Sequence, residues 1–295
     1  MKIYLAGGVT GNLIALWKEA WKQHEKMKLY LAGTQGNNSR GWIIEEGMKV
    51  YLAGIQGKAK DFVLKSYGPY ILESFFYIRN QHDWLIKMQE YFGSFLLDSG
   101  AFTFMQGSVS DTIDWDTYTE EYAKFINRHD IKLFFELDID AIVGLKEVER
   151  LRAKLEKLTN RKCIPVWHKS RGLEYWKTMV RDYDYVAIGG IVSKEIKQNE
   201  YDVFLPLLKI AKQNNCKVHG LGFTNLEKLK RYPFYSVDST AWLYGNRGGF
   251  LYHFNGTTME KFAAKGQRLK SGGRLAAINN FNEWLKFSQY ADKYL

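Results

Sequence analysis

The chain of 295 residues contains only two cysteines, Cys163 and Cys216, which stand far apart. Neither has a second cysteine or a histidine pair nearby, so a disulfide framework and a cysteine-rich structural zinc site are excluded. Both thiols are expected to be reduced and buried. Proline is also scarce, with four residues, and no stretch rich in serine or glycine marks a boundary between domains.

Long apolar runs are absent as well. None approaches the roughly 18 to 20 residues that a membrane span needs, and the N-terminus lacks the apolar region and cleavage site of a signal peptide. We therefore expect a cytoplasmic protein with no membrane partner. Hydrophobic residues still make up 46% of the chain and aromatic residues 16%, so a large core is available and wholesale disorder is excluded.

Negative charge is in the minority. Lysine and arginine number 42 against 32 aspartate and glutamate residues, which gives a net charge of +10. This sign favours polyanionic partners such as nucleic acid. The basic residues are spread along the chain, and most of their small clusters are typical of solvated helix faces.

Eight short apolar runs end in polar residues or glycine, which is typical of strands. They lie at 49–54, 70–78, 95–102, 132–140, 162–168, 185–192, 217–223 and 234–242. Charged stretches with helical spacing separate most of them. This alternation predicts an α/β protein with a (β/α)8 TIM barrel as its single domain.

The phrase MKIYLAG opens the chain, and it returns as MKLYLAG at residue 27 and MKVYLAG at residue 48. The spacing changes after the second copy and the series stops at three, which excludes a solenoid. No GK[ST] sequence follows, so a phosphate-binding loop is disfavoured. We predict that 1–47 is an N-terminal extension of repeated strand modules without catalytic residues, and that 48–295 forms the barrel.

The last 22 residues have the pattern of an amphipathic helix. We expect this C-terminal helical tail to pack across the barrel. Trp284, Phe287 and Tyr290 are predicted to be its core anchors rather than a platform for a nucleotide.

Acidic residues collect toward the ends of three predicted strands. Asp98 and Asp238 each end an apolar run, and alternation places Glu136, Asp138 and Asp140 on one face of a third run. Because the apolar residues are expected to face the outer helices, these acids are predicted to face the barrel mouth, where such barrels carry their chemistry. The alternative for Asp98 and Asp238 is that each caps a following helix.

Glycine pairs on two neighbouring predicted strands, in AIGGIV and HGLGF, would free backbone N–H groups near these acids. Buried carboxylates are costly unless they are paired or used, so their convergence favours a functional site. A pocket of this kind could serve glycosyl chemistry, a metal ion or recognition of a base edge. Composition leaves all three open.

Five phrases in order decide between them. DSGAF (98–102), ELDID (136–140), YVAIGGIV (185–192), HGLGF (219–223) and SVDST (236–240) together resemble the tRNA-guanine transglycosylase superfamily. The matching strands of that family carry DSGGF, a strand-end Asp, AIGGLAVGE, MGVG and a late nucleophilic Asp. The similarity extends over about residues 48 to 245.

The resemblance implies base exchange through a covalent intermediate. Asp238 matches the nucleophile that attacks the anomeric carbon and displaces guanine, and Asp98 matches the general acid and base. Asp138 matches the acid that accepts hydrogen bonds from the Watson–Crick edge of the base, with Asp140 as the second assignment. Phe102 is assigned to the base site as a stacking face, and Gly189 and Gly190 as backbone donors. The other positions assigned to the base site are Ser99, His168 and His219. His168 could equally be a satisfied core residue.

Departures from the family point to its DNA-modifying branch. The chain is short and has no counterpart of the C-terminal Cys/His zinc site, so we predict no metal and no organic cofactor. Ser193 and Lys194 precede Glu195 where the family phrase has other residues, and His219 replaces a stacking Met. The chain is therefore most similar to phage-type enzymes that insert 7-deazaguanine derivatives into DNA, with DNA and a free modified purine base as expected partners.

Three other functions stay open. One is a tRNA-guanine transglycosylase of the queuine type. Another is a nucleoside deoxyribosyltransferase, since KIYLAG also resembles the opening strand of that family, although that family is much shorter and not a barrel. The third is a catalytically inactive barrel that only binds nucleic acid. The sequence does not indicate an oligomeric state.

Overall fold

The computed structural model describes residues 47–54, 70–83, 85–86, 94–100, 103–104, 113–223, 225–243, 250–263 and 273–295. Apart from residue 47, the predicted N-terminal extension 1–47 lies outside the described residues. The same holds for Phe102, the predicted stacking residue.

Eight parallel strands form one sheet, in the order β4-β3-β2-β1-β8-β7-β6-β5. Their bounds are Lys49–Ala53 for β1, Tyr70–Ser74 for β2, Ser94–Asp98 for β3, Leu133–Phe134 for β4, Val166–Trp167 for β5, Tyr185–Ile188 for β6, Lys217–Gly220 for β7 and Ser236–Ser239 for β8. A parallel bridge between Phe135 and Ile164 joins the two edges, so the sheet closes on itself. Each predicted run overlaps one of these strands, and the predicted α/β barrel is confirmed.

Strand β1 is the third copy of the repeated phrase, and it lies between β2 and β8. Tyr51 is the register partner of Tyr70 on one side and of Asp238 on the other. Residues 48–54 therefore supply the first barrel strand, as the sequence predicts.

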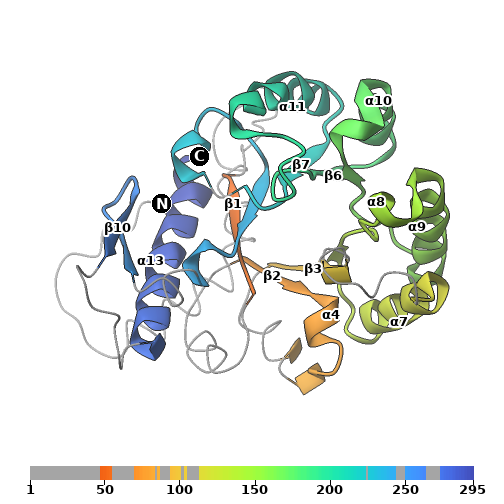
Figure 1. Ribbon diagram of the computed structural model, residues 1–295, viewed down its shortest axis with the longest axis horizontal. Helices are drawn as coiled ribbons and strands as arrows, with labels where there is room; N and C mark the ends of the chain where they lie inside the picture. Colours follow the sequence, from red (N-terminus) through yellow and green to blue (C-terminus); the bar gives the residue numbers. More distant parts are fainter. Residues whose placement is uncertain are drawn as a thin grey trace, which may run out of the picture. The chain divides into compact units, whose positions relative to one another are not determined.

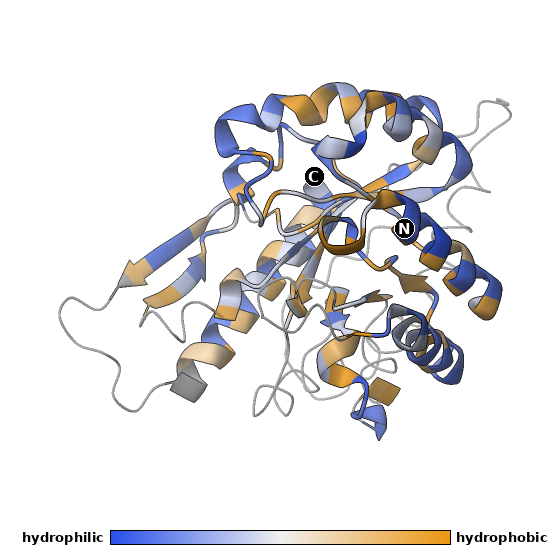
Figure 2. Ribbon diagram, turned by 45° about the vertical axis from the view of Figure 1, so that its right-hand side comes forward, coloured by the Kyte–Doolittle hydropathy of each residue, from blue (hydrophilic) through white to orange (hydrophobic). Residues whose placement is uncertain are grey.

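Helices follow several of the strands. They are α4 (Phe75–Ile78), α7 (Trp115–Arg128), α8 (Asp140–Val143), α9 (Leu145–Thr159), α10 (Gly172–Asp182), α11 (Phe204–Gln213) and α13 (Gly273–Tyr294), with short 3-10 helices η3 (Lys169–Arg171), η4 (Gln198–Val203) and η5 (Leu226–Lys228). Figure 1 shows α7, α9, α10 and α11 on the outer side of the strands. The longer helices carry both hydrophobic and hydrophilic residues (Figure 2), as expected of helices with one face on a sheet.

The start of α7 shows how sequence sets a helix boundary. The side chain of Asp114 accepts hydrogen bonds from the backbone N–H groups of Asp116 and Thr117, which have no partner within the first turn. Tyr118 and Tyr122 then follow at a spacing of four residues and are both buried. Capping and spacing together direct one face of α7 onto the barrel.

The barrel has an inner core and an outer one. The inner core consists of residues from six neighbouring strands and strand ends: Tyr51, Ala53, Leu72, Leu96, Phe135, Ile164, Val166 and Ala187. Two larger apolar clusters pack between the strands and the surrounding helices. Every second residue of a strand therefore faces the barrel interior.

The alternation predicted for residues 134–140 is wrong. Phe135 lies in the inner core, whereas Phe134, Leu137 and Ile139 all lie in the outer one. Strand β4 ends at Phe134, and after the bridge at Phe135 the chain has no regular extended structure until α8. The period of two residues is lost there, so Glu136 does not share the position of Asp138 and Asp140.

The C-terminal region adds a feature that the sequence did not predict. Strands β9 (Phe250–Phe254) and β10 (Met259–Ala263) form an antiparallel hairpin between β8 and α13. The hydroxyl of Ser288 in α13 donates to the carbonyl of Val50 in β1 at 2.9 Å. Trp284 and Phe287 are buried, which confirms that the C-terminal helix packs on the barrel.

Among the described residues, none of the helices has the combination of length and apolar character that a membrane crossing requires.

Candidate active site

Two acids lie near the carboxyl ends of barrel strands, at positions that face the barrel interior. Asp98 ends β3 two residues after Leu96, which belongs to the inner core. Asp238 follows Ser236 by two residues in β8, and Ser236 bonds to His219 inside the barrel. Side chains two residues apart in a strand share a face, so both carboxylates point inward at the mouth.

Asp98 sits in a tight turn. Its Oδ2 accepts a hydrogen bond from the Gly100 N–H at 2.9 Å. Gly100 has φ +82°, and a Cβ there would lie 2.5 Å from the Cβ of Phe76, so only glycine fits. Burial, together with the charges of Asp138 and Asp238, raises the pKa of Asp98 from 3.8 to about 6, against the lowering effect of the Gly100 N–H. The three acids therefore influence one another electrostatically.

Asp238 is held by two donors. Its Oδ1 accepts from the Gly222 N–H at 2.6 Å and faces His219 Nε2 at 3.2 Å, and the residue is 8% exposed. Both partners come from the end of β7 rather than from a helix after β8, so the helix-cap alternative for Asp238 is wrong. No hydrogen bond among the described residues uses Oδ2.

His219 lies beneath Asp238 in the barrel interior and is fully buried. Its Nδ1 is 2.6 Å from Ser236 Oγ, which is 2.5 Å from the hydroxyl of Tyr185. The rings of Tyr51 and Phe135 pack against the imidazole. The sequence-based prediction placed His219 in the base site, whereas its described contacts are with the inner core and Asp238.

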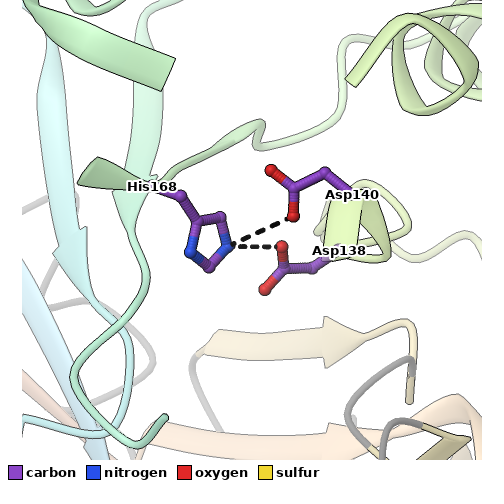
Figure 3. A group of neighbouring side chains, drawn as sticks. All are labelled: Asp138, Asp140 and His168. Carbon is purple, nitrogen blue, oxygen red and sulfur yellow. Dashed lines mark hydrogen bonds and ion pairs between the residues drawn. The ribbon is translucent and has the colours of Figure 1, made fainter. Parts of the chain in front are cut away.

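His168, at the end of β5, joins the predicted base-binding acids. Its Nε2 is 2.7 Å from Asp138 Oδ1 and 4.0 Å from Asp140 Oδ1. Figure 3 shows the two carboxylates facing the same ring nitrogen. On the other side of the ring, Nδ1 is 2.9 Å from Glu195 Oε2. His168 is therefore a bridging residue at the mouth rather than an apolar core residue.

The ionic state of His168 follows from these contacts. Burial opposes the charge on the ring, but the hydrogen bond with Asp138 and the charges of Asp138 and Asp140 outweigh it and raise the pKa of His168 from 6.5 to about 9. The ring is consequently an imidazolium at neutral pH, where it balances part of the negative charge of the mouth.

We expect this ion pair to stabilise the fold in a pH-dependent way. Because the pKa is higher in the folded state, the stabilisation is complete below pH 6.5 and is lost as pH rises to 9. Relative to His168→Gln, the free energy of unfolding of the unmodified protein should fall by roughly 3 kcal/mol across this window. Urea unfolding at several pH values measures it, and His253→Gln, at an exposed histidine of β9, is the control. A pH-independent difference would contradict the assigned charge.

A buried ionic network lies behind His168. Glu136 is fully buried, and its carboxylate accepts from Arg171 Nη1 at 3.0 Å, from Arg152 Nη1 at 3.1 Å and from the Val166 N–H at 2.8 Å. Arg171 Nε also donates to Asp140 Oδ2 at 3.0 Å. Glu136 is thus a paired structural acid, and Asp140 is held by Arg171.

Two of these residues were missed by sequence reasoning. Arg171 follows His168 by three residues and ends η3, in the segment after β5, and Glu195 follows the GG pair by five residues. Their positions shortly after the carboxyl ends of β5 and β6 were the available signal. The sequence around Arg171 or Glu195 does not indicate the partner of either residue, because each contact joins the ends of two different strands.

Of the two glycines predicted to donate to a base, Gly189 is contradicted by the structure. The Gly189 N–H donates to the carbonyl of Trp167 at 2.8 Å, because the pairing of β5 with β6 continues one residue past β6. Gly190 has φ +79°, and a Cβ there would lie 2.8 Å from Glu195 Oε2. Its lack of a side chain lets Glu195 approach. The other predicted contact, Ser99, is fully buried, and its carbonyl accepts from the Tyr118 hydroxyl at 2.6 Å.

Asp138, Asp140 and His168 could together hold a metal ion, since one ligand atom from each lies within 4.8 Å of the others. Carboxylate oxygen and imidazole nitrogen suit divalent ions. A metal would have to displace the proton that His168 shares with Asp138.

We expect that the protein functions without a metal ion at these three residues, so that the proton between His168 and Asp138 stays in place. Exhaustive dialysis against EDTA should leave the base-exchange activity expected from the sequence unchanged within about twofold. The reason is that the His168 imidazolium already lies between the carboxylates of Asp138 and Asp140. The measurement is initial rate before and after chelation. Loss of activity that Mn²⁺ or Zn²⁺ restores would show instead that the three residues form a metal centre.

A separate cavity of about 1000 Å³ lies between α13 and the β9–β10 hairpin, with Phe250, Tyr252 and Trp284 in its lining. None of the strand-end acids lines it. Glu227, Lys230 and Lys261 also line it. Because the acids with mutual electrostatic effects lie at the strand ends, we assign the chemistry to the barrel mouth.

No protein-family model and no curated protein match the chain. Among solved structures, it is similar to the carboxyl transferase domain of Rhizobium etli pyruvate carboxylase, with 12% identity, a TM-score of 0.44 and 84% of this chain covered. The chain spans about half of that protein's length, 49%. It is also similar to a protein described as a fructose-1,6-biphosphate aldolase from Coccidioides immitis, with 11% identity, a TM-score of 0.49, and 84% and 88% of the two chains covered. Likeness at this level carries no functional inference, and the barrel assignment rests on the strand order.

Proposed function

We propose that the protein is a base-exchange transglycosylase that replaces guanine in DNA with a 7-deazaguanine derivative through a covalent Asp238–sugar intermediate. The observation that carries the proposal is the presence of two carboxylates at one barrel mouth in different environments. Asp238 is fixed by two donors, whereas Asp98 has a pKa of about 6 and can both give and take a proton near neutral pH. Nucleophile and acid–base residue differ in this way in retaining glycosyl transfer.

In the first half of the reaction, Asp238 attacks C1′ of the target nucleotide. The C1′–N9 bond breaks, its electron pair leaves with guanine, and Asp98 supplies a proton to the departing base. In the second half, Asp98 takes a proton from the incoming base, whose nitrogen attacks C1′ and expels the Asp238 carboxylate. Two inversions at C1′ retain the configuration of the sugar.

Asp138 supports recognition of a guanine-like edge. Its Oδ1 faces His168, and the side chain remains 21% exposed. A carboxylate oxygen accepts hydrogen bonds from the ring N–H and amino group of such an edge. Glu195 holds His168 from the opposite side, so the acceptor is preorganised before a base binds.

A nucleic-acid substrate is supported by the net charge of +10, and DNA as the polymer follows from the resemblance to the phage-type enzymes. A target base must leave the stack to reach acids inside a barrel mouth. Basic residues that contact phosphates would make binding weaken with salt.

The test is release of ¹⁴C-guanine from labelled double-stranded DNA in the presence of 7-deazaguanine, with labelled tRNA and deoxyguanosine in parallel reactions. Release from DNA that depends on the added base supports the proposal. Release only from tRNA supports the queuine-type alternative, and release only from the free nucleoside supports a deoxyribosyltransferase. Salt-dependent DNA binding without release from any substrate would indicate the inactive binding barrel.

A further inference from the structure

We propose that His219 is the positioning residue of Asp238 and that it makes Oδ2 the attacking oxygen, an inference that rests on the proposed function. His219 Nε2 and the Gly222 N–H both face Oδ1. With one oxygen held by two donors, the carboxylate cannot rotate freely, and Oδ2 is the oxygen left for C1′.

The hydrogen-bond partners define where the His219 proton lies. The Gly222 N–H already donates to Asp238 Oδ1, so this oxygen is an acceptor. Nε2 must therefore carry the proton that it directs at the same oxygen. Nδ1 then faces Ser236 Oγ at 2.6 Å, and Tyr185 lies one step further at 2.5 Å. The order Tyr185, Ser236, His219, Asp238 fixes the imidazole from behind, as outer partners fix a catalytic histidine.

His219 has no room for a second orientation. It is fully buried, with the ring centroids of Tyr51 and Phe135 at 5.8 and 5.3 Å from its own. Tyr185 and Ser236 belong to strands β6 and β8 on either side of β7, which carries His219. Tyr185, Ser236 and His219 form a hydrogen-bonded chain, here called the relay, that lies inside the barrel and cannot contact a substrate. His219 thus acts through Asp238 alone.

The position of the donors affects the two halves of the reaction differently. When Oδ2 bonds to C1′, Oδ1 becomes the carbonyl oxygen of the glycosyl ester and keeps both hydrogen bonds. When the C1′–Oδ2 bond breaks, its electron pair returns to the carboxylate, and the charge on Oδ1 strengthens those hydrogen bonds. Losing His219 should therefore slow release of the sugar from Asp238 and let the adduct accumulate.

The kinetic test uses His219→Ala, His219→Gln and the control His253→Gln. We expect His219→Ala to lower kcat about 10²-fold, as for loss of one preorganised donor, with a change in KM for the base below about threefold. The fraction of DNA-linked protein on a denaturing gel should rise. Gln can restore an N–H donor and should recover at least about tenfold. A folded His219→Ala with normal kcat, or no rescue by Gln, would overturn the proposal.

A second measurement does not depend on activity. In NMR spectra of protein labelled with ¹⁵N-histidine, the His219 resonances are those that are missing from the spectrum of the His219→Gln variant. Coupling patterns should place the proton on Nε2, and Ser236→Ala should shift Nδ1. A proton on Nδ1 alone would overturn the relay. Absence of exchange on DNA, tRNA and nucleoside would instead reject the proposed function, and this result on the relay would still stand.

Discussion

Replacing Asp238 with asparagine is expected to abolish base exchange, with kcat reduced by roughly 10⁴-fold or more. An amide is a poor nucleophile and cannot form the glycosyl ester. The fold should be retained, because the amide oxygen can still accept from the Gly222 N–H and from His219 Nε2. The measurement combines guanine release with trapping of the DNA–protein adduct, which should disappear.

DNA affinity of Asp238→Asn is the matched control. Asp238 is only 8% exposed, and contacts with DNA phosphates are made mainly by basic and polar groups, so we expect Kd for duplex DNA to change less than about threefold. Retained binding together with lost exchange separates an enzyme from a barrel that only binds. Undiminished guanine release by a pure, folded Asp238→Asn protein would remove Asp238 from the reaction.

Replacing Asp98 with asparagine should inactivate the protein and stabilise it at the same time. Proton transfer by a positioned group contributes about 10² to 10⁴-fold, so kcat should fall by that factor. Stability should rise at neutral pH, because burial disfavours the ionised Asp98. The Gly100 N–H keeps an acceptor in the amide oxygen. Such a trade between activity and stability is common at active sites.

The sign of the pH dependence follows from the raised pKa. Between pH 3.8 and about 6 the folded protein binds more protons at Asp98 than the unfolded chain does. The free energy of unfolding therefore falls as pH rises through this window. Relative to the unmodified protein, Asp98→Asn should gain up to about 2 to 3 kcal/mol by pH 7. Paired urea titrations at pH 4 and pH 7 measure this, and an equal difference at both values would contradict it.

The strand positions could be predicted because each strand is a short apolar run closed by a polar residue or glycine. Even β4 and β5, with two residues each, lie inside their predicted runs. The inward direction of Asp98 and Asp238 also follows from sequence, since β3 and β8 keep the period of two residues up to these positions. Two local features were still missed, namely the loss of the period of two residues after Phe135 and the hairpin of β9 and β10.

The failures at the site share a physical cause, which is that the deciding partner is remote in sequence. Glu136 is buried by Arg171, which is 35 residues away. Gly189 loses its free N–H to a neighbouring strand, and His219 is enclosed by Tyr51 and Phe135 from other strands. No local period encodes such contacts.

The closure of the barrel between β4 and β5 has a consequence for the site. The backbone contribution there is one bridged pair, flanked by the hydrogen bonds Ile164 N–H to Phe134 and Glu136 N–H to Ile164. Beyond it, side chains cross the gap, through His168 with Asp138 and Arg171 with Glu136 and Asp140. The junction between β4 and β5 is held by some of the charged side chains that would bind a base. We therefore expect a ligand that binds these side chains to stabilise this junction of the barrel as well.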